Sequence, residues 1–158
     1  MKELLMKLNA CPKAMEWVGN KSWEECYATC HRGDWLLWLF KRTNPDDLQL
    51  LTLAKGHCAN TVRHLMKDER SIKAVDAAIA FGEGKISRDE LDASASAADD
   101  AYADAIYAAA AADAAYAAYV AFDADAAAAD FAAAKKENQQ LTADICRKYL
   151  PIEVWNIK

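Results

Sequence analysis

The chain has 158 residues, of which 54% are hydrophobic and 27% charged, and its formal net charge is −5 at pH 7. This length is typical of one domain, and the lack of a basic patch argues against direct nucleic-acid binding. No apolar run approaches the roughly 18 residues of a membrane span, and the charges at Lys2, Glu3 and Lys7 predict no signal peptide, so we expect one cytoplasmic domain over residues 1–158.

The first part of the chain carries local signals that start and stop helices. Pro12 suits a first helical position, and Gly19 suits a stop a few residues later. Ser22 is followed three residues later by a glutamate, which is the spacing of a capping box. The sequence therefore predicts a short helix after Pro12 and another over residues 23–30.

Two further helices are predicted after Gly33 and after Asn44. Gly33 is expected to break the preceding helix, and Asp34 to cap the next one and to pair with Arg32. Asn44 precedes a proline and two aspartates, a combination typical of a helix start. The apolar residues between positions 48 and 65 then recur at spacings of three or four, which is the helical period.

The helix that follows is predicted to begin at Asp68 and to end near Gly82. Asp68, Arg70 and Asp76 are expected to form a structural cluster of a helix cap and salt bridges where this helix meets the preceding one. Ser87, with a glutamate three residues later, forms a second capping box. This box predicts the start of a long alanine-rich helix.

Residues 89–134 form an acidic, alanine-rich segment. They contain ten acidic residues and no lysine or arginine, and 25 of the 42 residues in Ala93–Ala134 are alanine. Alanine is the best helix former and is depleted in strands. As one helix these 46 residues would extend about 70 Å, against about 40 Å for a globule of this size. We therefore predict a helical hairpin, with its break near Ala110–Asp113.

The last helix is predicted over Gln139–Leu150, and the C-terminal tail 151–158 is expected to dock through Trp155. Strand signals are nearly absent. Together the elements predict an all-α, single-domain helical bundle of about six to eight helices. In this fold the Trp-rich short N-terminal helices pack on the Ala/Asp-rich hairpin.

Several segments resemble one family of helical proteins. They are Arg32–Trp38, Cys58–Arg70 and Ala74–Gly84, followed by the alanine-rich stretch. They resemble the alanine-rich, all-helical immunity-protein family of bacterial polymorphic toxin systems, which has relatives in phages and prophages. The resemblance extends over about residues 10–150. It implies a bacterial or phage-encoded cytoplasmic protein that acts by binding, without catalytic residues or a cofactor.

The acidic segment is the predicted partner-binding surface. Negative charge speeds the encounter with a basic partner, and tyrosine offers contact area at a low entropic cost. We interpret the chain as a non-catalytic inhibitor that neutralises a protein with a basic surface, either a toxin or a defence effector. A solvated helix face is the alternative, and helix-to-helix homodimerisation is also considered. The predicted contact residues are Asp99, Asp100, Asp104, Tyr102, Tyr107, Asp113, Asp123 and Asp125.

The tryptophans suggest a second function. Four of the five fall within 22 residues, at positions 17, 23, 35 and 38, and could build either a core or an exposed anchor. The alternative function is a module that sequesters a small molecule or nucleotide. Its predicted pocket residues are Trp35, Trp38, His57 and Arg63.

The cysteines do not predict a disulfide framework or a metal site. There are five, an odd number, and their spacing fits reduced thiols in a cytosolic protein. Cys26, Cys30 and His31 could share one helix face, but tight Cys-x2-Cys pairs of the kind found in structural zinc sites are lacking. No motif supports an activated nucleophile. We therefore expect no metal and no enzymatic activity.

Overall fold

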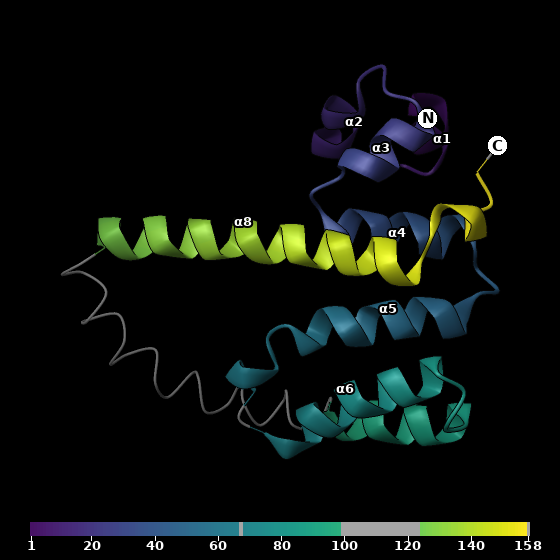
Figure 1. The fold of residues 1–158 in the computed structure, drawn as a ribbon, viewed down its shortest axis with the longest axis vertical. Coiled ribbons are helices and arrows are strands. Elements are labelled where there is room, and N and C mark those ends of the chain that lie inside the picture. The colour runs from purple at the N-terminus through teal and green to yellow at the C-terminus, as the bar shows by residue number, and fades with distance from the viewer. Residues whose placement is uncertain (67, 99–123, 158) are drawn as a thin grey trace.

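The computed structural model describes residues 1–66, 68–98 and 124–157 of the chain (Figure 1). Every regular element in these ranges is a helix, which confirms the predicted all-α fold. The first half contains α1 (Lys2–Lys7), α2 (Pro12–Val18), α3 (Trp23–Thr29), α4 (Gly33–Thr43) and α5 (Leu48–Asn60). These are followed by the 3-10 turn Arg63–Leu65, α6 (Glu69–Gly82), helical residues 88–98, α8 (Ala124–Tyr149) and the 3-10 turn Ile152–Val154.

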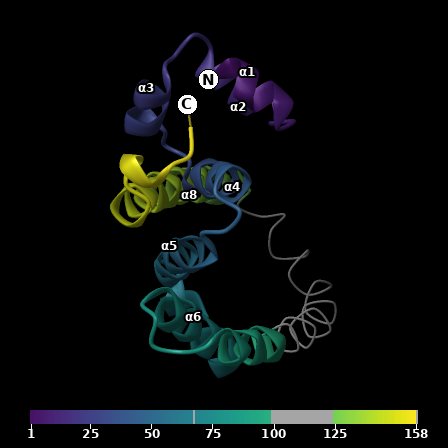
Figure 2. The same cartoon turned by 90° about the vertical axis from the view of Figure 1, so that its right-hand side faces the viewer.

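The helices are stacked in layers along the long dimension of the molecule (Figures 1 and 2). The short helices α1, α2 and α3 form one end. Next comes the layer in which α4 runs beside α8, then α5, and then α6 with helical residues 88–98. Within the ranges given above, no helix is long and apolar enough to cross a membrane.

The hydrophobic core is centred where α4, α5 and α8 meet the C-terminal tail, and it extends to buried residues of α1, α2 and α3. Phe40, Cys146 and Leu150 are its largest fully buried side chains, and Trp155 is 6% exposed. The Trp155 ring contacts the Phe40 ring edge-on, and its Nε1 donates to the carbonyl of Leu150 at 2.9 Å. The prediction that the tail docks through Trp155 is therefore confirmed.

Two glycines allow neighbouring helices to approach each other closely. A Cβ atom on Gly33 would lie 2.6 Å from the carbonyl carbon of Thr142, where α4 crosses α8. A Cβ on Gly82 would lie 2.6 Å from the Cα of Leu53, where α6 crosses α5. Gly33 therefore does more than separate two helices, because only a residue without a side chain fits against α8.

Three predicted helix starts are confirmed in detail. At the start of α3, Ser22 accepts from the Glu25 amide at 3.2 Å, and the Ser22 amide donates to the Glu25 carboxylate at 2.8 Å. Ser87 and Glu90 make the same reciprocal pair. Asp68 caps α6 by accepting from the Arg70 amide at 2.8 Å. Each bond satisfies an amide that the first helical turn leaves without a backbone partner.

Two other predicted starts are wrong, because the caps of α4 and α5 are Arg32 and Asp47, two and three residues from the predicted positions. Helix α4 begins at Gly33, so Asp34 lies in its first turn and is not its cap. The expected ion pair is present, because Asp34 receives two hydrogen bonds from Arg32 at 2.7 and 2.5 Å. Asn44 ends α4 instead of starting α5, which begins at Leu48. A tertiary contact explains this difference, because the Asn44 side chain donates to the carbonyl of Val154, which is distant in sequence, at 2.7 Å.

The predicted cluster of Asp68, Arg70 and Asp76 contains two separate ion pairs. Asp68 pairs with Arg70 at 2.8 Å, next to the cap that it forms. Asp76 pairs with Arg63, which belongs to the 3-10 turn before α6. The Asp76–Arg63 pair therefore fastens α6 to the α5–α6 connection, and the Asp68–Arg70 pair lies beside the cap of α6.

The boundary predicted between the alanine-rich hairpin and the last helix is wrong. Residues Ala124–Tyr149 form one continuous helix, so no break separates position 134 from Gln139. The physical reason is that the intervening residues are lysine, glutamate, asparagine and glutamine, and none of them is a strong helix breaker. The predicted break near Ala110–Asp113 lies outside the described residues.

Candidate functional site

The four N-terminal helices line a partly open cavity of about 500 Å³, which we call the Trp pocket. Each of α1, α2, α3 and α4 contributes lining residues. The lining is mainly apolar, with one ion pair, one asparagine and three thiols. Its largest side chains are four of the five tryptophans of the chain, Trp17, Trp23, Trp35 and Trp38.

Helix α4 supplies the pocket from one of its two apolar faces. Leu36 and Phe40 are buried in the core, four residues apart on one face. Trp35 and Trp38, three residues apart, line the pocket on another. This division follows from helical geometry, in which residues three or four apart share a face.

The wall formed by Trp17 and Trp35 is an aromatic cluster with cations beside it. The two rings lie 5.9 Å apart with a tilt of 59°, and His31 lies 6.1 and 6.2 Å from them. The Lys21 ammonium lies 4.5 Å from the centre of the Trp17 ring, and the Arg32 guanidinium lies 4.7 Å from the centre of the Trp35 ring. Such cation–π contacts hold ring orientations in place.

The charged groups of the pocket neutralise each other. Arg32 and Asp34 both line it and form the bidentate ion pair described above. Burial alone would raise the pKa of Asp34, but the hydrogen bonds and the charge of Arg32 outweigh this effect and lower that pKa. The carboxylate therefore stays ionised and paired at neutral pH.

The two buried thiols of the lining are poor nucleophiles. Burial raises the pKa of Cys26 and of Cys30, so both are protonated at neutral pH. The Cys30 thiol also donates weakly to the carbonyl of Arg32 at 3.5 Å. These groups offer a soft, weakly polar surface to a ligand.

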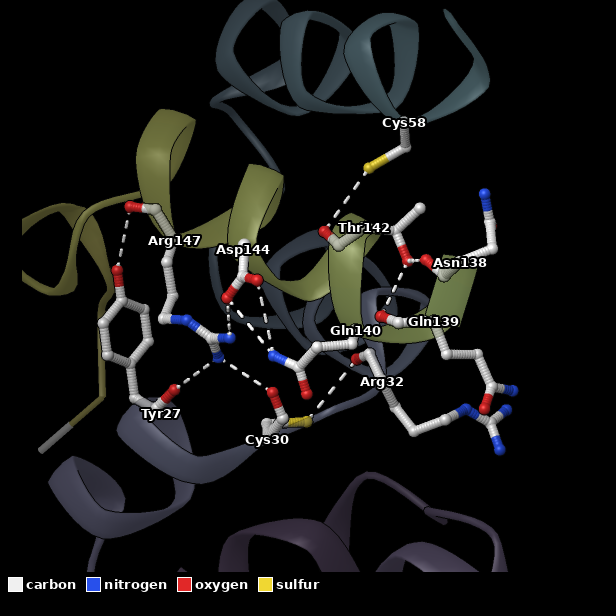
Figure 3. A network of polar contacts seen from close by, with 10 residues as sticks. All are labelled: Tyr27, Cys30, Arg32, Cys58, Asn138, Gln139, Gln140, Thr142, Asp144 and Arg147. Atoms are coloured by element: carbon white, nitrogen blue, oxygen red, sulfur yellow. Dashed lines mark hydrogen bonds and ion pairs between the residues drawn. The ribbon is translucent and has the colours of Figure 1, made fainter. Parts of the chain in front are cut away.

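Helix α3, which forms one wall, is fastened to α8 by a polar network (Figure 3). Arg147 donates to the carbonyls of Tyr27 and Cys30 at 3.1 and 2.8 Å, and thereby satisfies the end of α3. In return, the Tyr27 hydroxyl contacts the carbonyls of Arg147 and Leu150, each at 3.1 Å. The wall is therefore held by hydrogen bonds as well as by packing.

The four residues predicted to line one pocket lie in two separate places. Trp35 and Trp38 line the Trp pocket, but His57 and Arg63 do not. The His57 ring stacks on Tyr149 at 4.1 Å, and Arg63 pairs with Asp76. The physical reason is that both belong to segments beyond the α4–α8 layer, away from α1, α2 and α3 (Figure 2).

Most of the predicted partner-binding residues lie outside the described residues. These are Asp99, Asp100, Tyr102, Asp104, Tyr107, Asp113 and Asp123. Asp125 lies in α8, of which only the backbone is described at that position. Earlier in the same acidic segment, Asp89, Glu90 and Asp92 lie on helical residues 88–98 and are exposed.

Across residues 1–66, 68–98 and 124–157, no group of three or more His, Cys, Asp or Glu side chains could hold a metal ion. Comparison with known proteins adds no relatives: no family model, no curated protein and no solved structure matches the chain. The class that the structure defines is an all-α bundle with a partly open aromatic pocket among its N-terminal helices.

Proposed function

We propose that this chain is a non-catalytic binding protein and that the Trp pocket is its ligand site. The observation that carries the proposal is the cavity of about 500 Å³ lined by four indole rings and one ion pair. Small-molecule sites are typically concave, about 300–1,000 Å³ in volume, mainly apolar and equipped with a few polar groups. The Trp pocket has each of these properties.

The lining favours a planar aromatic ligand that is neutral or carries one charge. Indole rings bind other rings through tilted or offset contacts, which add to the gain from burial. Among the lining side chains, the charged ones are those of Arg32 and Asp34, which already neutralise each other. A triphosphate would need several unpaired cations, so the nucleotide version of the sequence-based hypothesis is disfavoured. Nη1 of Arg32 can still donate to one acceptor on the ligand, because the ion pair uses Nε and Nη2.

The acid–base properties of the lining support binding over catalysis. General acid–base chemistry needs a group whose pKa lies near the working pH. The pKa of Asp34 is lowered and the pKa values of Cys26 and Cys30 are raised, so the three groups are shifted away from neutrality. The pocket is therefore suited to holding a molecule and not to moving its protons.

Thermal-shift measurements with simple aromatic probes test this proposal. The probes are indole and indole-3-acetate, with cyclohexane carboxylate as a non-aromatic control. A ligand at 100 times its Kd stabilises the folded state by about 2.7 kcal/mol, which corresponds to a Tm rise of about 5–10 °C for a chain of this size. Tryptophan fluorescence should change in parallel, because four of the five tryptophans line the pocket.

Two variants locate the binding. Trp38→Leu should abolish the shift by removing a ring of the lining. Lys41→Ala should preserve it, because Lys41 is exposed on the same helix and lies outside the lining. The proposal fails if no probe raises the Tm of the native chain at millimolar concentration. It also fails if Trp38→Leu responds as the native chain does.

A second candidate function is neutralisation of a basic partner protein through the acidic segment. It rests on the resemblance to immunity proteins and on the exposure of Asp89, Glu90 and Asp92. Reversing the charges of Asp99, Asp100 and Asp104 to lysine should lower the association rate with a toxin or defence effector at low salt, with little change in Tm. An unchanged rate would remove the electrostatic argument. Light scattering on the purified chain tests homodimerisation.

A further inference from the structure

Two cysteines from different helices face each other across the α5–α8 contact. The sulfur of Cys58 on α5 lies 3.9 Å from the sulfur of Cys146 on α8. Cys146 is 1% exposed, and Cys58 is partly exposed. The Cys58 thiol also lies 3.7 Å from the carbonyl of Thr142, one turn before Cys146 (Figure 3). The ligand pocket uses neither sulfur.

We propose that Cys58 and Cys146 form a redox-active dithiol, which a peroxide converts into a disulfide that ties α5 to α8. The sulfur atoms need to approach from 3.9 Å to about 2.05 Å. This movement requires a change in side-chain rotamers, a shift of one helix, or both. Disulfides that form in cytosolic proteins are commonly redox-sensing, which fits a pair that is reduced at rest.

The surroundings of the two sulfurs assign them different roles. The hydrogen bond with Cys146 lowers the pKa of Cys58, although burial acts in the opposite direction. The same bond, together with burial, raises the pKa of Cys146. Cys58 is therefore the better thiolate and the more accessible sulfur, so it is the one that attacks the peroxide. Cys146, already in contact with it, is the resolving cysteine.

The reaction balances with hydrogen peroxide as the oxidant. The Cys58 sulfur attacks one peroxide oxygen, the O–O bond breaks, and water and a Cys58 sulfenic acid form. The Cys146 sulfur then attacks the Cys58 sulfur, its proton joins the departing hydroxyl, and a second water leaves. Two electrons pass from the thiols to the peroxide. The products are one disulfide and two waters.

The disulfide would close a loop that contains the whole acidic segment. Cys58 and Cys146 are separated by 88 positions, and residues 89–134 lie between them. Cross-links that close long loops constrain the unfolded chain most strongly. Oxidation is therefore expected to stabilise the fold and to fasten α5 to the helix that leads out of the acidic segment.

The test is mild oxidation of the intact, reduced chain. The chain is treated with a small excess of hydrogen peroxide, alkylated under denaturing conditions and digested for mass spectrometry. We expect a cross-linked peptide pair containing Cys58 and Cys146, the loss of two of the five thiols, a Tm rise of at least about 5 °C, and reversal by dithiothreitol. Free Cys58 and Cys146 at a dose that oxidises the exposed Cys11 would overturn the proposal.

Three variants keep the outcome interpretable. Cys11→Ser, which removes the exposed thiol, should form the disulfide as the native chain does. Cys146→Ala should stop at the Cys58 sulfenic acid, which dimedone traps. Cys58→Ser leaves the buried Cys146 without its partner and should show no peroxide-dependent rise in Tm. If Cys146→Ala does not fold, the Cys58→Ser result decides: a rise in its Tm equal to that of the native chain contradicts the proposed pair.

Discussion

Replacing Asn44 with alanine should loosen the C-terminal tail and cost about 2–3 kcal/mol of unfolding free energy. Asn44 is 2% exposed, and its amide nitrogen donates to Val154 at 2.7 Å and to Asp47 at 2.9 Å. Its carbonyl oxygen accepts from Thr43 at 2.9 Å and from the Asn156 amide at 3.3 Å. Each bond contributes about 0.5–1.5 kcal/mol. The four bonds together contribute about 2–6 kcal/mol, and a loss in the lower part of this range is expected, since Asn156 is exposed and its amide can bond to water instead.

The loss should be visible both in stability and in the environment of Trp155. Urea unfolding followed by circular dichroism gives the free energy, and a loss of 2–3 kcal/mol corresponds to a Tm lower by about 5–10 °C. Trp155 lies between two residues that Asn44 binds, so its fluorescence should shift towards that of an exposed indole. Asn20→Ala, at an exposed position between α2 and α3, is the control. A loss below about 1 kcal/mol with unchanged fluorescence would refute the reasoning.

Three further predictions follow from particular contacts. Gly33→Ala should lower the unfolding free energy by about 1–3 kcal/mol, as measured by thermal unfolding, because the new Cβ would lie 2.6 Å from the carbonyl carbon of Thr142. Adding Thr142→Ala should not restore the stability, because that backbone atom remains. Arg147→Ala should weaken indole binding as well as lower the Tm, because the hydrogen bonds of Arg147 hold the end of the α3 wall. An unchanged affinity for indole would show that the position of this wall does not affect binding. Burial lowers the pKa of His57 below its unfolded value of about 6.5, so the unfolded chain binds the proton more readily. The stability that comes from keeping His57 neutral is complete above pH 6.5 and is lost as the pH falls through the lowered pKa. His57→Phe, which keeps a ring against Tyr149, should therefore reduce the difference in urea midpoint between pH 7.5 and 5.5.

Local hydrogen bonds explain what could be predicted from the sequence. Ser22, Ser87 and Asp68 each bond to a backbone amide two or three residues away, so their role is visible in a short window of sequence. The apolar spacing that predicted α5 and α6 is also a local property. The all-α fold class follows from such windows, because every segment favours helix independently.

Long-range contacts explain what could not be predicted. Asn44 looks like a helix start in its local window, and only its bond to Val154, 110 positions away, makes it the end of α4. The residue types of His57 and Arg63 suit the same pocket as Trp35, yet α5 lies on the other side of the α4–α8 layer (Figure 1). The end of a helix and the location of a pocket residue therefore depend on tertiary contacts, because the same side chain can bind either a local or a distant partner.

The Trp pocket exists because the helices that cover one apolar face of α4 are too short to fill the space beside it. Residues 35–40 are all apolar, and a helix that is apolar on opposite faces has to be covered on both. The long helix α8 and Trp155 cover the face of Phe40, and that side is filled. The opposite face carries Trp35 and Trp38, and its cover consists of α1, α2 and α3, which have only six or seven residues each. Such short helices bring too few large side chains to fill the space between the indoles, so a cavity remains that a planar ligand can occupy.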